Sequence, residues 1–199
     1  DDNSTHGTIG AHSDVGLGSF DAIFMRKDPP FDMRFFYSTH VLGLVDASKC
    51  LVLNRPSGLR EANEKLYALH FPSVIPETLV TCEMKRIKDF VTEMNGEAIV
   101  KPLDGAGGAG IFHLRSEDRN LNSILEYATD EGRRMIMAQR YLPEARRGDK
   151  RILLLAGKPL GAILRVPADN EARGNLHVGD VAEADRDAAI TAVEEPKRE

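Results

Sequence analysis

The feature that most constrains this chain is the stretch Glu97–Leu114, which reads EAIVKPLDGAGGAGIFHL. Residues 98–100 are apolar and partly β-branched, which favours a strand, and Lys101 is the one cation that follows them. Residues 111–114 look like a second strand. Between the strands lie four glycines within six residues: Gly105, Gly107, Gly108 and Gly110. Because glycine has no Cβ, backbone N–H groups in such a turn can crowd towards an anion, and a lysine beside it indicates a polyphosphate.

The order of these parts excludes two well-known nucleotide loops. Gly105-x-Gly107-x-x-Gly110 matches the dinucleotide fingerprint by letter, but that fingerprint needs a helix next and β-like residues follow here. A P-loop needs Gly-Lys-Ser/Thr at the end of the turn, whereas Lys101 precedes it. What remains is a hairpin whose flexible tip closes over phosphates. The pattern alone also allows a tight, solvent-exposed β-turn.

Composition narrows the class of protein. A length of 199 residues allows one domain or two small ones, and 42% apolar with 29% charged residues is ordinary for a globular chain. There is no apolar run of transmembrane length and the polar start DDNSTHG is not a secretory signal, so we expect no membrane partner. Cys50 and Cys82 lie in apolar surroundings and are interpreted as free thiols, which predicts a cytoplasmic protein. A disulfide between them is the alternative, although a chain of this size does not need one. The net charge of −5 and the absence of tryptophan argue against nucleic acid as a partner. A homo-oligomer is left open.

The first third of the chain predicts a small α/β unit. Residues 1–20 are polar and glycine-rich, which predicts a flexible tail. A strand over 21–27, a helix over 33–48 and a strand over 51–53 predict a parallel pair. Arg26 lies at the end of the first strand, where ligands commonly meet an α/β sheet, although a surface cation beside a turn is equally consistent.

The middle of the chain predicts alternating elements around the glycine-rich hairpin. Residues 59–71 read as a helix with Lys65 next to its apolar stripe, an ordinary place for an exposed lysine head. A strand over 78–82 and an amphipathic helix over 83–94 follow, and Asn95-Gly96 is a good helix C-cap.

The last third predicts a hinge, a hairpin and a lid. A helix over 121–127 and a strand over 134–140 lead into Tyr141-Leu142-Pro143, which suits either an adenine hinge or an ordinary strand exit. Residues 151–166 predict a second hairpin with Arg151 and Arg165 at one end. They suit phosphate oxygens or a solvated edge, and loop length decides whether they share a face.

Residues 167–180 form a polar segment that could serve as a lid, with Arg173 and Asn175 as its ligand-facing members, or a disordered surface loop. Residues 182–195 predict a short helix.

Several of these segments together resemble prokaryotic glutathione synthetase, an ATP-grasp ligase, in roughly residues 20–179 and in the order of that family. The segments that carry the resemblance are MRKDPPFD (25–32), NRPSGLREANEKL (54–66), KPLDGAGGAGIF (101–112), AQRYLPE (138–144), GDKRILL (148–154) and RVP…ARGNLHVG (165–179).

The resemblance implies an α/β (α+β) protein with a partial ATP-grasp fold, in which a small parallel α/β unit precedes antiparallel, hairpin-containing subdomains. The implied division is a tail over 1–20, a remnant of the substrate domain with a linking helix over 21–76, and an incomplete ATP-grasp domain over 77–199. The implied reaction joins γ-glutamylcysteine and glycine through an acyl phosphate, using ATP with Mg²⁺ or Mn²⁺ and releasing ADP and phosphate.

The resemblance also implies roles for individual residues. Those that would hold or cover ATP phosphates are Lys65, Lys101, Gly105, Gly107 and Gly108. Those that would border the adenine or reach the ribose are Gln139, Arg140, Tyr141, Leu142 and Asp149. Arg151 and Arg165 would be catalytic by steadying the triphosphate and the acyl phosphate. Arg26, Arg173 and Asn175 would lie near the peptide substrate or the phosphates.

The chain departs from the pattern of the family after Gly179, where the family continues with further glycines, an arginine, a helix and strands. In the family, an acidic residue and a Glu-x-Asn motif at the end of the final sheet bind magnesium, whereas here Gly179 runs directly into Asp180 and a predicted helix. Glu61-Ala-Asn63 and Glu93-Met-Asn95 match that motif by letter, but both fall in predicted helices in the wrong place. We therefore expect a chain truncated at both ends with no metal ligands before Glu199. The alternative to a working ligase is an inactive homologue that at most binds nucleotide or a complementary chain. Another ATP-grasp ligase is disfavoured by MRKDPPFD and ARGNLHVG.

Overall fold

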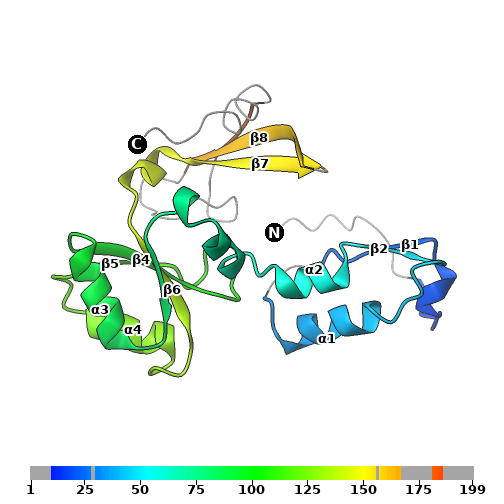
Figure 1. Cartoon of the computed structure of the whole chain (residues 1–199), viewed down its shortest axis with the longest axis horizontal. Coiled ribbons are helices and arrows are strands. Elements are labelled where there is room, and N and C mark those ends of the chain that lie inside the picture. The colour runs from blue at the N-terminus through cyan, green and yellow to red at the C-terminus, as the bar shows by residue number, and fades with distance from the viewer. Residues whose placement is uncertain (1–9, 28–29, 156, 167–180, 186–199) are drawn as a thin grey trace. The chain divides into compact units, whose positions relative to one another are not determined.

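The computed structural model describes residues 10–27, 30–155, 157–166 and 181–185. The chain divides into two compact units (Figure 1). The first comprises Asp1–Asp28 and Met33–Glu61, and the second comprises Pro29–Asp32 and Ala62–Glu199.

The first unit is a small α/β structure. Its elements are η1 (Leu17–Ser19), β1 (Ala22–Phe24), α1 (Met33–Leu42), β2 (Leu51–Leu53) and α2 (Pro56–Glu61). β1 and β2 pair in parallel, which confirms the predicted pair. The guanidinium of Arg60 joins α2 to α1 by donating to the carbonyl oxygen of Thr39 at 3.0 Å. The first helix ends at Leu42 rather than at the predicted residue 48, because Asp46 accepts hydrogen bonds from the backbone and the hydroxyl of Ser48 and so forms a turn.

The second unit is built around a four-stranded antiparallel sheet in the order β3-β6-β4-β5. Its strands are β3 (Thr78–Thr81), β4 (Glu97–Pro102), β5 (Phe112–Arg115) and β6 (Ile136–Arg140). Helices α3 (Met84–Glu93) and α4 (Leu121–Thr129) lie together on one face of this sheet (Figure 1). The hairpin formed by β4 and β5 confirms the strand–turn–strand prediction for residues 97–114.

Side-chain alternation in β4 separates the two faces of this sheet. Ala98 and Val100 are fully buried in the core against the helices, together with Leu125 of α4. Ile99 and Lys101 therefore point to the opposite face, because successive side chains of a strand alternate. The predicted C-cap of α3 is confirmed, since Asn95 and Gly96 both adopt positive φ, 59° and 87°.

The segment between the units differs from the helix predicted over residues 59–71. α2 ends at Glu61, and two short 3-10 helices follow, η2 (Leu66–His70) and η3 (Pro72–Val74). The interruption lies at Asn63, whose side chain accepts hydrogen bonds from backbone N–H groups that a continuous α-helix would pair with carbonyls.

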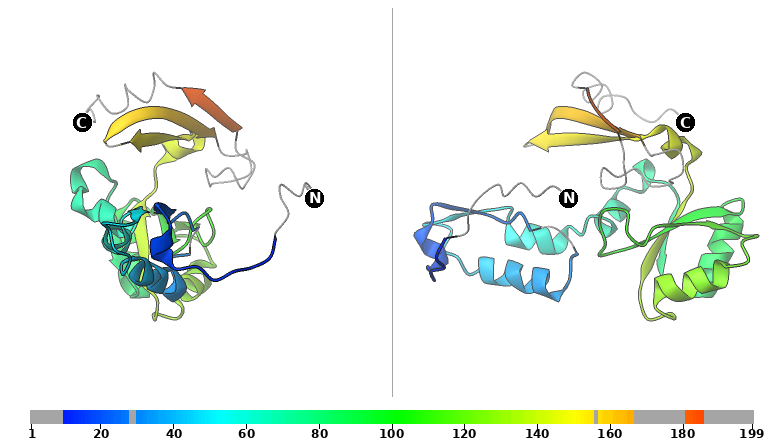
Figure 2. Two further views of the ribbon diagram at one scale, coloured as in Figure 1. Left: turned by 90° about the vertical axis from the view of Figure 1, so that its right-hand side faces the viewer. Right: turned by 180° about the vertical axis from the view of Figure 1, so that it is seen from behind.

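A second antiparallel sheet completes the described part of the second unit. η4 (Pro143–Arg147) leads into β7 (Asp149–Leu155), β8 (Lys158–Val166) and β9 (Val181–Asp185), in the order β7-β8-β9. Figure 2 shows β9 beside the β7–β8 hairpin. The helix predicted over 182–195 is therefore wrong at 182–185, where backbone pairing with β8 overrides helix propensity, and residues 186–195 lie outside the described part. No helix in the described residues is long and apolar enough to cross a membrane.

Candidate functional site

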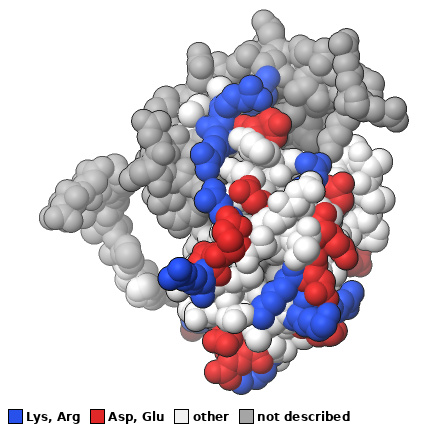
Figure 3. All heavy atoms as spheres, turned by 90° about the vertical axis from the view of Figure 1, so that its left-hand side faces the viewer, with Lys and Arg blue, Asp and Glu red and all other residues white. Residues whose placement is uncertain are grey.

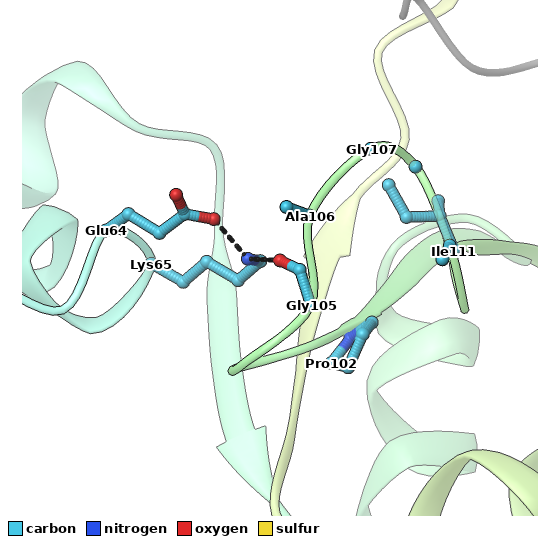
Figure 4. Close-up of a pocket in the computed structure, with 9 residues that line it drawn as sticks. Glu64, Lys65, Pro102, Gly105, Ala106, Gly107 and Ile111 are labelled. Carbon is cyan, nitrogen blue, oxygen red and sulfur yellow. Dashed lines mark hydrogen bonds and ion pairs between the residues drawn. The ribbon is translucent and has the colours of Figure 1, made fainter. Parts of the chain in front are cut away.

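The glycine-rich loop between β4 and β5 forms a pocket with Lys65 (Figure 4). Three of its glycines have positive φ, namely 67° at Gly107, 79° at Gly108 and 72° at Gly110. Such backbone conformations favour glycine, so the loop is held in a shape that other residues would strain. The lining residues are Glu64, Lys65, Pro102, Gly105, Ala106, Gly107, Gly108, Ala109 and Ile111.

The ring of Pro102 supports the base of this loop. A Cβ atom added to Gly105 would lie 2.8 Å from Pro102 Cγ, and one added to Gly110 would lie 3.2 Å from it. Both glycines therefore allow the two ends of the loop to pack against one proline ring. The loop is thus shaped by close packing at its base as well as by its backbone angles.

Lys65 reaches the loop from the segment before η2. Its ammonium donates to the carbonyl oxygen of Gly105 at 2.7 Å and to Glu64 Oε1 at 2.5 Å. Figure 4 shows the amine of Lys65 between these two oxygens, next to the loop. The glycine loop and this cation are therefore in direct contact.

Lys101 is the second cation beside the loop. Desolvation, and secondarily the positive charge of Lys65, lowers the pKa of its ammonium below 10.5. Among the described residues, no carboxylate forms an ion pair with Lys101. Lys65 and Lys101 repel one another electrostatically, and among the described residues only Lys65 has a carboxylate partner, Glu64, so this site favours a multiply charged anionic ligand.

Several surface cations outside the pocket are paired instead. Lys85 contacts Asp89 at 2.6 Å, and Arg133 contacts Asp130 at 2.9 Å. Figure 3 shows blue Lys and Arg side chains interleaved with red Asp and Glu side chains over much of one face. These pairs contrast with Lys101, which is desolvated and has no ion-pair partner among the described residues.

The segment Gln139–Leu142 lies at the end of β6. Gln139 is buried and donates to the hydroxyl of Thr78 at 2.8 Å, while Arg140 pairs with Glu77 at 2.5 Å. The ring of Tyr141 stacks on the imidazole of His113 with centroids 4.0 Å apart and 24° between planes. The Tyr141 hydroxyl also accepts a hydrogen bond from Arg146 at 2.9 Å. Leu142 follows with 37% of its surface exposed.

The register of β7 and β8 decides whether Arg151 and Arg165 lie on the same face of the hairpin. Asp149 lies opposite Arg165, and Arg151 lies opposite Ile163. Opposed residues share a face and Ile163 is two residues from Arg165, so Arg151 and Arg165 point to the same face. Arg165 donates from Nε to Asp149 Oδ1 at 3.1 Å and forms a second contact to the other carboxylate oxygen. This pair fixes the orientation of the Arg165 guanidinium.

Comparison with known proteins identifies the family. The model of the prokaryotic glutathione synthetase ATP-grasp domain matches residues 64–194, and the model of the N-terminal domain of the same synthetase matches residues 1–60. The chain belongs to the prokaryotic glutathione synthetase family. A relative named glutathione synthetase from Gloeobacter violaceus is 53% identical over 177 residues, which are 86% of this chain and 54% of the relative. The chain spans about half the length of the curated relatives it matches.

Solved structures support the fold of this family member. The crystal structure of D-cycloserine synthetase DcsG aligns with a TM-score of 0.66 at 20% identity, covering 89% of this chain and 64% of the other. The ATP-grasp ligase PsnB, complexed with phosphomimetic precursor, Mg and ADP, aligns at a TM-score of 0.50 and 18% identity, covering 76% and 45%. Both the suspected family and the mixed α/β ATP-grasp fold are therefore confirmed.

The remaining predicted site residues of this glutathione synthetase homologue are located only in part. Arg26 is exposed and follows β1 in the first unit. Arg173 and Asn175 lie outside the described residues. Within the described ranges, no group of three or more His, Cys, Asp or Glu side chains is placed to hold a metal ion. ATP-grasp ligases use ATP with a divalent metal, but these residues do not offer a set of ligands for one.

Two supporting residues were not assigned from the sequence. Asn63 had a detectable signal, because an asparagine side chain can accept a hydrogen bond from the backbone two residues on, but the sequence analysis placed this residue inside a helix. His113 had no signal in the local sequence, since its stacking contact with Tyr141 joins β5 to the residue that follows β6.

Proposed function

We propose that this chain provides the ATP site of a glutathione synthetase, which ligates γ-glutamylcysteine and glycine. The observation that carries the proposal is the pocket lined by the glycine loop and Lys65, beside the desolvated Lys101 whose pKa the charge of Lys65 lowers further. An ATP triphosphate is the anion that these two cations and the loop's backbone would accept. The high identity to relatives named glutathione synthetase supports the choice of substrates.

In the proposed reaction, a carboxylate oxygen of γ-glutamylcysteine attacks the γ-phosphorus of ATP, and the bond to the β-phosphate oxygen breaks to release ADP. The amine of glycine then attacks the acyl carbon, loses a proton, and phosphate leaves. Lys65 and Lys101 hold the phosphates and offset the charge of the transferred group, with Gly105, Gly107 and Gly108 closing over them.

The other assignments are also proposals. Gln139, Arg140, Tyr141 and Leu142 border the adenine, and Asp149 reaches the ribose. Arg151 and Arg165 stabilise the triphosphate and the acyl phosphate, which their shared face supports. Arg26, Arg173 and Asn175 contact the peptide substrate. We also propose the cytoplasm as the compartment, which the two free thiols support, and Mg²⁺ as the accompanying ion.

The test is phosphate release by the purified chain with MgATP, γ-glutamylcysteine and glycine, omitting each in turn, together with equilibrium binding of ATP. Release that requires all three, with binding of ATP, is the expected result for a working ligase. ATP binding without release would support the alternative, a homologue that binds nucleotide but does not turn over. Absence of ATP binding would contradict both functions.

Replacing Gly110 by alanine is expected to weaken ATP binding about fivefold. Alanine at a φ of +72° is strained by about 1 kcal/mol, and its Cβ would press on Pro102 at 3.2 Å, so the loop would leave its present shape. The matched control is Gly157→Ala in the β7–β8 turn, where φ is +78° and no atom lies within 4 Å of the added Cβ. The control should lose stability and keep its ATP affinity; equal losses of affinity in both variants would contradict a specific role for the loop's shape.

A further inference from the structure

Asn63 connects the segment that carries Lys65 to the strand end that carries Lys101. Its side-chain oxygen accepts hydrogen bonds from the backbone N–H groups of Lys65 at 3.0 Å and Leu66 at 2.9 Å. Its side-chain nitrogen donates to the carbonyl oxygen of Leu103 at 3.2 Å, 40 residues further along the chain. One side chain thus makes three hydrogen bonds to two distant backbone segments.

The two hydrogen bonds accepted by the Asn63 side-chain oxygen fix the backbone conformation around Lys65. As a helix N-cap does, they provide partners for backbone N–H groups at the start of η2. The backbone oxygen of Asn63 also accepts from the N–H of Tyr67 at 2.8 Å. Lys65 is therefore held at the first turn of η2, with its ammonium reaching Gly105 at 2.7 Å.

The bond to Leu103 sets the distance between the two cations. Leu103 lies two residues after Lys101 and two before Gly105, at the point where β4 enters the glycine loop. Among the described residues, this is the side-chain hydrogen bond that joins the Lys65 segment to the strand end, and the bond from the Lys65 ammonium to Gly105 joins the same segment to the loop through a flexible side chain. A backbone bond from Phe31 to Asp104 at 3.2 Å braces the next residue of the same loop.

We propose that Asn63 is a positioning residue for nucleotide binding, which holds Lys65 and Lys101 at the spacing that a polyphosphate requires. This inference rests on the proposed ATP site. Asparagine suits the position because its amide both accepts and donates, whereas aspartate only accepts and alanine does neither. Asn63 touches neither substrate nor phosphate in this role and acts through the backbone of Lys65 and Leu103.

The experiment compares Asn63→Ala, Asn63→Asp and the unmodified chain by calorimetric titration of ATP and by NMR titration of adenosine, which lacks phosphates. Asn63→Ala is expected to lose about tenfold in ATP affinity, because the lysine spacing is released. Its adenosine affinity is expected to stay unchanged, because the segment proposed to border adenine lies elsewhere. Asn63→Asp is expected to retain the slow amide exchange of Lys65 and Leu66 and still lose ATP affinity, since it keeps the cap and loses the bond to Leu103.

The matched control is Asp118→Ala, which removes a similar side-chain bond, from the N–H of Asn120 to Asp118 Oδ1 at 2.8 Å, before α4. It should leave the affinity for both ligands unchanged. If Asn63 has a merely structural role, Asn63→Ala would lower thermal stability and weaken the binding of ATP and of adenosine to the same extent. That result would overturn the inference. Unchanged ATP affinity in both Asn63 variants would also overturn it while leaving the proposed ATP site intact. A failure of the unmodified chain to bind ATP would instead overturn the proposed function and the inference together.

Discussion

Replacing Lys101 by methionine is expected to reduce ATP affinity by about a hundredfold. A hydrogen bond to a charged group in desolvated surroundings contributes about 2–3 kcal/mol, and methionine keeps the length of the side chain without its charge. Lys101 is the better target of the two lysines because its ammonium is the desolvated one and has no ion-pair partner among the described residues. The measurement is calorimetric titration of ATP at constant ionic strength.

The same substitution is expected to stabilise the nucleotide-free chain. Desolvation and Lys65 lower the pKa of Lys101 in the folded state, so folding at neutral pH disfavours its charged form. Below the folded-state pKa both states are protonated and the penalty is complete. As the pH rises towards 10.5, the unfolded chain holds a proton that the folded chain has lost, and the penalty fades. The stability advantage of Lys101→Met over the unmodified chain should therefore shrink as the pH rises through this range.

The control for Lys101→Met is Lys85→Met, which removes the same charge from an exposed position in α3 beside Asp89. It should leave ATP affinity unchanged and should not stabilise the chain. If Lys101→Met bound ATP as well as the unmodified chain, or lowered its thermal midpoint, the assignment of Lys101 as a desolvated phosphate ligand would be wrong.

Replacing Leu125 by alanine is expected to lower the free energy of unfolding of the second unit by about 2–5 kcal/mol. Leu125 is fully buried in the cluster that joins α3 and α4 to the four-stranded sheet. Removing its branched end leaves a cavity beneath β4, the strand that carries Lys101. Because the chain has two units, unfolding of the whole chain is not expected to be two-state.

The measurement is therefore the urea dependence of amide hydrogen exchange at Ala98 and Val100, which reports on β4 alone. Glu126→Ala changes the next residue of α4 on its exposed side and is expected to alter stability by no more than about 0.5 kcal/mol. A loss below about 1 kcal/mol in Leu125→Ala would mean that the helices do not stabilise the sheet that carries the candidate site.

The glycine-rich hairpin was predictable because all of its determinants are local. Apolar, partly β-branched residues over 98–100, glycines with no Cβ in the turn and a cation at the strand end act within eighteen consecutive residues. The cap at Asn95 and Gly96 follows from two adjacent residues, and the parallel pair of β1 and β2 follows from the strand–helix–strand order of the first unit. The family was also accessible, since its motifs occur in order along the chain.

Other features depended on distant partners and were missed for that reason. Residues 182–185 have a helix-favouring composition but form β9, because β8 supplies hydrogen-bond partners that local propensity does not include. The helix predicted through residue 63 breaks because the Asn63 side chain finds both local N–H groups and the carbonyl of Leu103. The stacking of Tyr141 on His113 likewise requires two strands to be brought together.

The sequence by itself determined the family and the glycine-rich hairpin, and it predicted the two lysines proposed to bind phosphate, since these depend on residue types and their order. Tertiary structure alone decided how the lysines are spaced, because Asn63 bridges segments 40 residues apart. It also decided that Arg151 and Arg165 share a face, because strand register sets side-chain direction and a shift of one residue would reverse it. Local patterns specify which groups are available, whereas packing and register specify where those groups meet.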